Sequence, residues 1–131
     1  MECIADTNIL IYDTIEDSEF HRKVSETLDL MDNILVPSVV LEEFVHAMKQ
    51  IDIGEEVIRK KILEILDACT FVPVGPVNIK DAIKVLTKEG VSSMRFNDKL
   101  ILSVAKEKSL PLFTFDKELI SECKANGVRI L

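Results

Sequence analysis

Short apolar runs alternate along the chain with longer segments in which apolar residues recur every three or four positions. The short runs predict strands at residues 2–5, 34–38, 71–74, 110–115 and 128–131. The longer segments predict helices at residues 18–32, 39–50, 55–68, 77–89, 96–108 and 117–126. Short apolar strands that alternate with helices predict a parallel sheet covered on both faces. We therefore expect a three-layer α/β/α fold whose central parallel sheet has about five strands.

The composition is that of one globular domain, which we place over residues 1–131. Hydrophobic residues make up 47% and charged residues 30% of the 131 positions, enough for a core of ordinary size. No apolar run approaches the roughly 18–20 residues of a membrane span, and the N-terminus does not resemble a signal peptide. Cys3, Cys69 and Cys123 are odd in number and lack the paired spacing of a zinc site. These features predict a cytoplasmic protein with reduced thiols and no membrane contact.

The formal net charge is −7, which argues against a protein that binds phosphates through general basicity. An acidic site that binds divalent cations also makes the balance negative, however. The charge therefore leaves a nucleic-acid substrate open.

Two aspartates follow predicted strands. Asp6 comes directly after residues 2–5, and Asp116 comes after residues 110–115. In parallel α/β sheets ligands bind outside the carboxyl ends of the strands, where both residues would lie. Each aspartate could equally be the N-cap of the helix that follows.

Two further carboxylates lie on predicted helices. Asp98 shares a helix stripe with Ile101, Leu102 and Ala105, where a carboxylate is costly unless it is paired or bound to a metal. It also falls in the first helical turn, so it could serve only as a first-turn anion. On the helix at residues 39–50, Glu43 lies at the flank of the apolar face, whereas Glu42 points away from it.

Four carboxylates at one sheet edge would repel one another and raise their pKa values. A divalent cation relieves this repulsion, and Mg²⁺ and Mn²⁺ prefer oxygen ligands. Cations held in this way support phosphodiester hydrolysis.

These segments, in this order, resemble the PIN-domain family of nucleases, especially the small single-domain proteins that include VapC-like toxins. "ADTNILIY" resembles the first acidic motif, "PSVVLEEF" the second, and "FNDKLILSVAKEKSLPLFTFDKEL" the third and fourth. The resemblance covers essentially the whole chain. It implies a Mg²⁺- or Mn²⁺-dependent endoribonuclease, often a homodimer, and in toxins a protein held inactive by an antitoxin partner.

The resemblance also assigns roles to residues. The catalytic and metal-binding acids would be Asp6, Glu43, Asp98 and Asp116. Asp6 and Asp98 would hold the principal cation, and Glu43 and Asp116 would complete its surroundings or orient the attacking water. Asn8 and Thr114 fall on supporting positions, where they would hydrogen-bond carboxylate oxygens.

The third motif reads Asn97-Asp98-Lys99 and departs from many relatives on both sides of the aspartate. Asn97 could cap the helix or join the site. Arg95 and Lys99 flank Asp98 and could contact RNA phosphates, although a solvated Lys99 is the simpler expectation. Arg59, Lys60 and Lys61 form the densest basic run, which fits the solvated face of an amphipathic helix.

Two other classes of function remain open. One is a PIN-like interaction module that holds a metal but has little intrinsic nuclease activity. The other is a phosphotransfer protein, either a receiver domain or an aspartate-nucleophile phosphatase. The phosphatases would need an aspartate at position 8, which is Asn8, and receivers would need a lysine near position 114, which is Thr114.

Overall fold

The computed structural model describes all 131 residues. Its centre is a four-stranded parallel sheet in the order β3-β2-β1-β4. The strands are β1 (Glu2–Ala5), β2 (Asn33–Pro37), β3 (Thr70–Val72) and β4 (Leu112–Phe113). The helices are α1 (Thr7–Thr14), α2 (His21–Asp29), α3 (Ser38–Gln50), α4 (Glu55–Ala68), α5 (Pro76–Glu89), η1 (Ser93–Arg95), α6 (Phe96–Lys108) and α7 (Lys117–Ala125).

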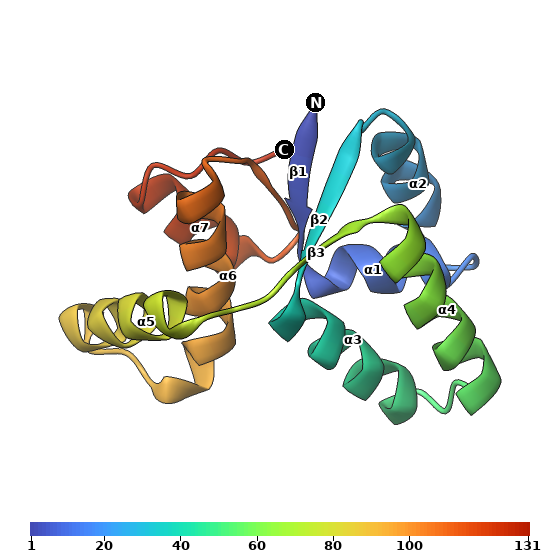
Figure 1. The fold of residues 1–131 in the computed structure, drawn as a ribbon, viewed down its shortest axis with the longest axis horizontal. Coiled ribbons are helices and arrows are strands. Elements are labelled where there is room, and N and C mark those ends of the chain that lie inside the picture. Colours follow the sequence, from blue (N-terminus) through green and yellow to red (C-terminus); the bar gives the residue numbers. More distant parts are fainter.

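Helices cover both faces of the sheet, which confirms the predicted α/β/α layers. Figure 1 shows α5, α6 and α7 on one side and α1 to α4 on the other. The central strands are correspondingly apolar: Cys3, Ile4 and Ala5 of β1 are all fully buried. A strand that is buried on both faces has no solvated side to carry polar residues. None of the helices is both long and apolar enough to span a membrane.

The sheet has four strands rather than about five. Residues 128–131 form only an isolated parallel bridge between Ile130 and Leu112. Two backbone hydrogen bonds hold it: Leu112 donates to Arg129 O (2.9 Å) and Leu131 donates to Leu112 O (3.0 Å). Because β4 has only two residues, it offers too short an edge for a full fifth strand.

One helix starts later than predicted, and a further helix, α1, was not among the predicted segments. The helix expected at residues 18–32 is shorter, because the chain turns through Ser18 before α2 starts at His21. Asp6 does precede a helix, since α1 begins at Thr7 directly after β1. The expected cap is therefore present, and the carboxylate is also buried, at 6% exposure.

The strand register brings distant parts of the chain to one edge. Ala5 of β1 pairs with Phe113 of β4, and Asp6 donates its backbone N–H to Phe113 O at 3.0 Å. Asp6 and Thr114 therefore leave adjacent strands side by side. β2 ends at the same edge and leads directly into α3, because Ser38 follows Pro37.

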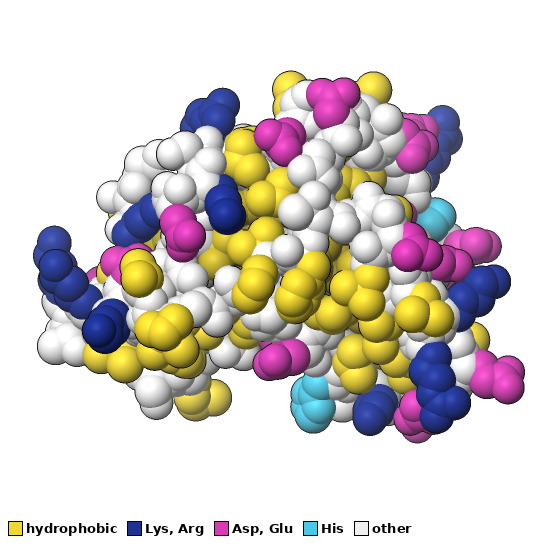
Figure 2. All heavy atoms as spheres, in the orientation of Figure 1, with side chains coloured by type: hydrophobic (Ala, Val, Ile, Leu, Met, Phe, Trp, Pro, Cys, Tyr) yellow, Lys and Arg dark blue, Asp and Glu magenta, His cyan; other side chains and the backbone are white.

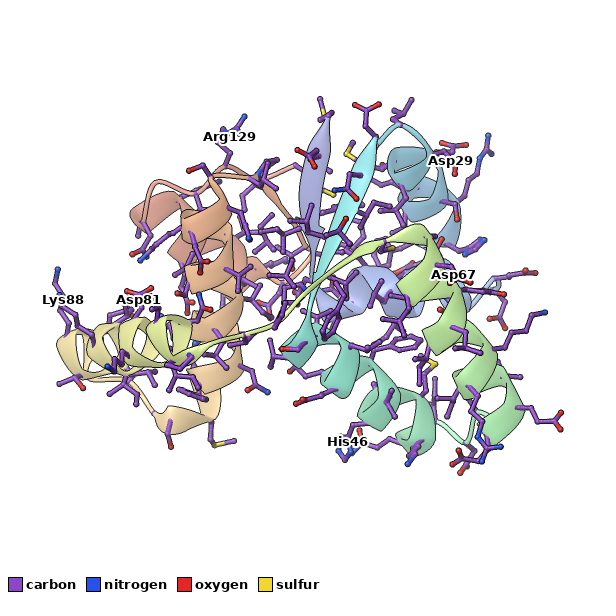
Figure 3. All side chains as sticks on the ribbon, viewed as in Figure 1. Asp29, His46, Asp67, Asp81, Lys88 and Arg129 are labelled. Carbon is purple, nitrogen blue, oxygen red and sulfur yellow. The ribbon has the colours of Figure 1, made fainter.

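The fully buried Phe44 anchors α3 in the core and so positions its neighbour Glu43. We expect Phe44→Ala to lower the free energy of unfolding by about 3–5 kcal/mol, because truncation leaves a cavity. Chemical denaturation measures this, with His46→Ala as the matched control. His46 lies on α3 but points away from the sheet (Figure 3) and should cost less than about 0.5 kcal/mol. Equal losses for the two variants would contradict this account of α3.

Candidate functional site

Asp6 is held by donors on three sides. Its Oδ1 accepts a hydrogen bond from the backbone N–H of Thr7 (2.7 Å). Its Oδ2 accepts one from Thr114 Oγ1 (2.6 Å) and a longer one from Asn8 Nδ2 (3.4 Å). The side chain thus caps α1 and at the same time presents a buried carboxylate at the sheet edge.

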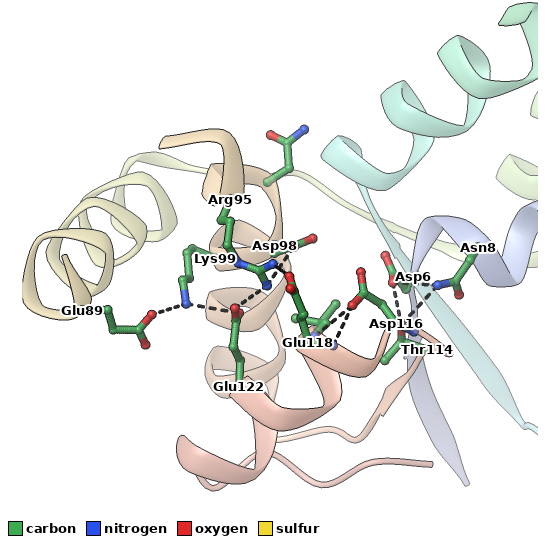
Figure 4. Close-up of polar contacts among 12 residues, drawn as sticks. Asp6, Asn8, Glu89, Arg95, Asp98, Lys99, Thr114, Asp116, Glu118 and Glu122 are labelled. Atoms are coloured by element: carbon green, nitrogen blue, oxygen red, sulfur yellow. Dashed lines mark hydrogen bonds and ion pairs between the residues drawn. The ribbon is translucent and has the colours of Figure 1, made fainter. Parts of the chain in front are cut away.

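Asn8 and Thr114 connect Asp6 to the loop that follows β4. Thr114 Oγ1 accepts from the backbone N–H of Asp116 at 3.0 Å and from Asn8 Nδ2 at 3.4 Å. Asn8 Oδ1 accepts from the backbone N–H of Phe115 at 3.4 Å. The two side chains therefore fix the loop carrying Asp116 relative to Asp6 (Figure 4).

Asp116 is itself the N-cap of α7. Its Oδ1 accepts from the backbone N–H groups of Glu118 (2.9 Å) and Leu119 (3.1 Å). For Asp116, as for Asp6, the cap and the carboxylate at the strand end are the same side chain. A helix N-terminus stabilises the negative charge at this position.

Glu43 reaches the site from α3 and is partly buried, whereas Glu42 is exposed. Its Oε1 accepts from Thr7 Oγ1 at 2.8 Å, and its Oε2 accepts from Asn97 Nδ2 at 3.4 Å. Glu43, Thr7 and Asn97 line a cavity of about 460 Å³ together with Glu42, His46 and Ala47. Asn97 thus joins the site, one of the two positions that the sequence left open for it.

Asp98 lies in the first turn of α6, and the residues of its predicted helix stripe, Ile101, Leu102 and Ala105, are buried as expected. Burial raises the pKa of its carboxyl to about 6, against the lowering effect of Arg95, and the charges of Asp116, Asp6 and Glu122 raise it further. Arg95 forms an ion pair with Asp98 at 3.2 Å. The side chain is 26% exposed, so it faces the solvent side of the site.

The carboxylates act on one another. Burial raises the pKa of Asp6, the hydrogen bonds from Thr114 and Thr7 oppose that shift, and the charges of Glu43 and Asp116 add to it. Asp6 and Asp116 likewise raise the pKa of Asp98. The four predicted acids are therefore close enough to interact electrostatically. Asp6 follows β1, Glu43 lies on α3, Asp98 lies on α6, and Asp116 lies in the loop between β4 and α7.

The expectation of a solvated Lys99 is wrong. Its side chain is 0% exposed, and its ammonium lies 2.5 Å from Glu89 and 3.1 Å from Glu122. An ammonium in this position cannot reach an RNA phosphate, so the suggested RNA contact of Lys99 is not retained.

Arg95 is also less free than its sequence position indicates. Besides Asp98, its guanidinium contacts the carboxylates of Glu118 and Glu122 on α7. Its side chain is 22% exposed. The basic run on α4 behaves more as expected, since Arg59 and Lys60 are exposed while Lys61 pairs with Asp13 at 3.1 Å.

Thr7 and Glu122 are site residues that the sequence analysis did not identify. The signal for Thr7 was its place beside Asp6, where its hydroxyl looked like one more capping group. Glu122 had no signal of its own in the sequence, because a buried lysine requires a carboxylate partner but Lys99 was not expected to be buried. Which element supplies that partner depends on the packing of α6 against α7.

The donor set suits a hard divalent cation, because every candidate ligand is a carboxylate or amide oxygen. As the side chains stand, however, no three acidic, histidine or cysteine groups converge closely enough to hold a metal ion. One visible reason is that Asp98 is turned to Arg95. The residues fit Mg²⁺ or Mn²⁺ chemically, and Asp98 would have to exchange its partner.

The cysteines do not offer a nucleophile. Burial raises the pKa of the Cys3 and Cys123 thiols to about 11 each, and it also raises that of Cys69. The thiols therefore stay protonated at neutral pH, and a thiolate mechanism has no support here.

The comparisons with known proteins agree with this architecture. The model of the PIN domain family matches residues 3–124. A comparison with curated proteins finds no match.

Several solved structures share the fold. One is VapC20 of Mycobacterium tuberculosis, a sarcin-ricin loop cleaving toxin, with a TM-score of 0.82, 14% identity and 98% of both chains covered. VapBC2 of Rickettsia felis, bound to a promoter DNA fragment, has a TM-score of 0.72 and 20% identity over 100% of this chain and 98% of that one. FitAcB of Neisseria gonorrhoeae has a TM-score of 0.73 and 17% identity over 100% and 96%. At these identities the likeness establishes the fold.

The raised pKa of Asp98 predicts a stability change. Between its ordinary value of 3.8 and about 6 the folded protein binds more protons than the unfolded chain, so this group lowers the free energy of unfolding as pH rises. Without divalent cations, Asp98→Asn should therefore be more stable than wild type by about 1–3 kcal/mol at pH 8. The gain should be largely lost near pH 4, where the Asp98 carboxyl is protonated in the folded protein and close to half-protonated in the unfolded chain.

Chemical denaturation in chelator at the two pH values measures this difference. Asp67→Asn, at an exposed position on α4, is the control and should show no such gain. An Asp98→Asn variant no more stable than wild type at pH 8 would refute the assigned burial cost.

Proposed function

This chain belongs to the PIN domain family, and on that premise we propose that it is a Mg²⁺- or Mn²⁺-dependent endoribonuclease. The observation that carries the proposal is the gathering of Asp6, Glu43, Asp98 and Asp116 at the carboxyl edge of the sheet. Four structural elements hold these carboxylates close together, where their negative charges repel one another. A site that consists of oxygen ligands and negative charge can bind a divalent cation, and such cations catalyse phosphodiester hydrolysis.

Each residue has a distinct proposed task. Asp6 and Asp98 hold the principal cation, directly or through water, and Glu43 and Asp116 complete its surroundings or orient the attacking water. Thr114 and Asn8 hold Asp6 in its rotamer, and Thr7 does the same for Glu43. A cation held by these residues would lower the pKa of a bound water and polarise a phosphoryl oxygen, which makes the phosphorus a better electrophile.

RNA must approach a protein of net charge −7. Arg95 remains the candidate for a phosphate contact, because it lies beside Asp98 and is partly exposed. Its guanidinium would first have to give up one of its carboxylate partners.

We also propose that the protein is the toxin of a toxin–antitoxin pair and forms a homodimer. The structural neighbours support the toxin role, since they include a toxin–antitoxin complex from Klebsiella pneumoniae and a member of the VapBC family of toxin–antitoxin systems from Mycobacterium tuberculosis. Exposed apolar side chains are a second support, because such patches mark protein interfaces. Figure 2 shows them gathered on the face that carries α4 and β3, where Leu63, Leu66 and Phe71 are 63%, 46% and 43% exposed.

The alternative, a PIN-like interaction module with little nuclease activity, has one observation in its favour. The acids do not converge on a metal position while Asp98 is paired with Arg95. Exchange of that one ion pair is a small rearrangement for a partly exposed side chain, so the nuclease is the better-supported function.

The test is cleavage of a mixed pool of structured RNAs in Mg²⁺, in Mn²⁺ and in chelator. We expect wild type to cut only with a cation, and Asp98→Asn to lose at least about 100-fold in rate, since it removes a proposed metal ligand. Glu56→Gln removes one exposed carboxylate from α4, outside the residues that line the candidate site, and should retain activity.

Cutting that persists in chelator, or equally in Asp98→Asn, would contradict the metal-site assignment. Absence of cutting under conditions where Mn²⁺ binds would favour the interaction module.

A further inference from the structure

A network of ion pairs extends from the candidate site to the far side of α6 (Figure 4). Arg95, at the end of η1, contacts Asp98 on α6 and both Glu118 and Glu122 on α7. Glu122 faces Lys99 as well. Glu122 is therefore the one carboxylate that touches both cations of the network.

Lys99 fixes Glu122 from the side opposite Arg95. Its side chain is 0% exposed and lies between Glu89 on α5 and Glu122, at 2.5 and 3.1 Å. A buried ammonium is costly without carboxylate partners, so this arrangement resists change. Glu122 Oε2 has no aligned hydrogen bond, and the Lys99 charge is what compensates its burial.

Arg95 is shared between the site and α7. Its guanidinium lies 3.2 Å from Asp98, and the two carboxylates of α7 attract it in the other direction. A divalent cation on Asp98 and the guanidinium would compete for the same negative charge. The strength of the α7 contacts therefore affects how readily Asp98 is released.

We propose that Glu122 is a positioning residue for the cation site: held by Lys99, it attracts Arg95 toward α7, so that Asp98 holds the guanidinium less tightly and Arg95 stays on α7 when a divalent cation binds Asp98. Arg95 thereby serves as an internal counter-cation for an otherwise unpaired site carboxylate. This inference rests on the proposed function, because it takes Asp98 to be a cation ligand.

Glu118 provides a matched control for Glu122. Both lie on α7 and contact Arg95, but the Glu118 side chain is 74% exposed and has no contact with Lys99, whereas Glu122 is 16% exposed. Exposed ion pairs contribute little, because water and salt screen them. Only Glu122 should therefore affect the position of Arg95 strongly.

The experiment is titration with Mn²⁺ in the absence of RNA, with free Mn²⁺ followed by electron paramagnetic resonance. We expect Arg95→Gln to bind Mn²⁺ several-fold more tightly, because the competing cation is gone. Glu122→Gln should bind about tenfold more weakly, because Arg95 then settles on Asp98. Glu118→Gln should change the affinity by less than about twofold.

The double variant Arg95→Gln/Glu122→Gln is decisive. If Glu122 acts through Arg95, the double variant binds like Arg95→Gln alone, a non-additive result that a purely structural role would not produce. Additive effects, or weaker binding by Arg95→Gln, would overturn the proposal. Arg95→Gln changes a partly exposed side chain, so it tests the competition even if Glu122→Gln does not fold.

Asp98→Asn separates this inference from the proposed function. If wild type and Asp98→Asn bind Mn²⁺ equally, or neither binds it, the cation-site assignment itself fails. If Asp98→Asn alone loses binding while the Arg95 and Glu122 variants match wild type, only the positioning role fails.

Discussion

Repulsion between carboxylates at one sheet edge is the constraint on which the site depends. The local structure offsets it in a different way for each acid. Asp6 receives three hydrogen bonds, Glu43 accepts from Thr7 and Asn97, Asp116 caps a helix, and Asp98 pairs with a guanidinium. The offset is incomplete at Asp98, where burial and neighbouring charges still raise the pKa to about 6. Residual strain of this kind is typical of sites that a ligand completes.

The fold supplies the constraint directly. A parallel sheet brings the ends of β1 and β4 together, and the helices that start there need capping groups. Asp6 and Asp116 meet that need while also presenting charge to the site. Capping and cation binding are therefore two uses of one carboxylate, and the fold can place these acids without strained backbone at either position.

Much of this was predictable from sequence, because parallel topology puts all strand ends at one edge and helix periodicity places Asp98 and Glu43. Strand–helix alternation predicted the three layers, and the ordered motifs predicted the family, which the match over residues 3–124 confirms. Lys99 was not predictable, because only the packing of α5 and α7 against α6 shows that its ammonium is enclosed. The strand predicted at residues 128–131 was not found at full length, because its partner β4 ends at Phe113. The next residue, Thr114, hydrogen-bonds Asp6 through its side chain.

The most direct test of the account is crystallographic: crystals grown with Mn²⁺, with anomalous diffraction recorded at the manganese absorption edge. The account predicts a strong anomalous peak between Asp6 and Asp98, about 2 Å from their carboxylate oxygens or separated from them by one bound water, with Arg95 moved away from Asp98. A cation-loaded crystal with no peak at this edge of the sheet, and Arg95 still paired to Asp98, would contradict it.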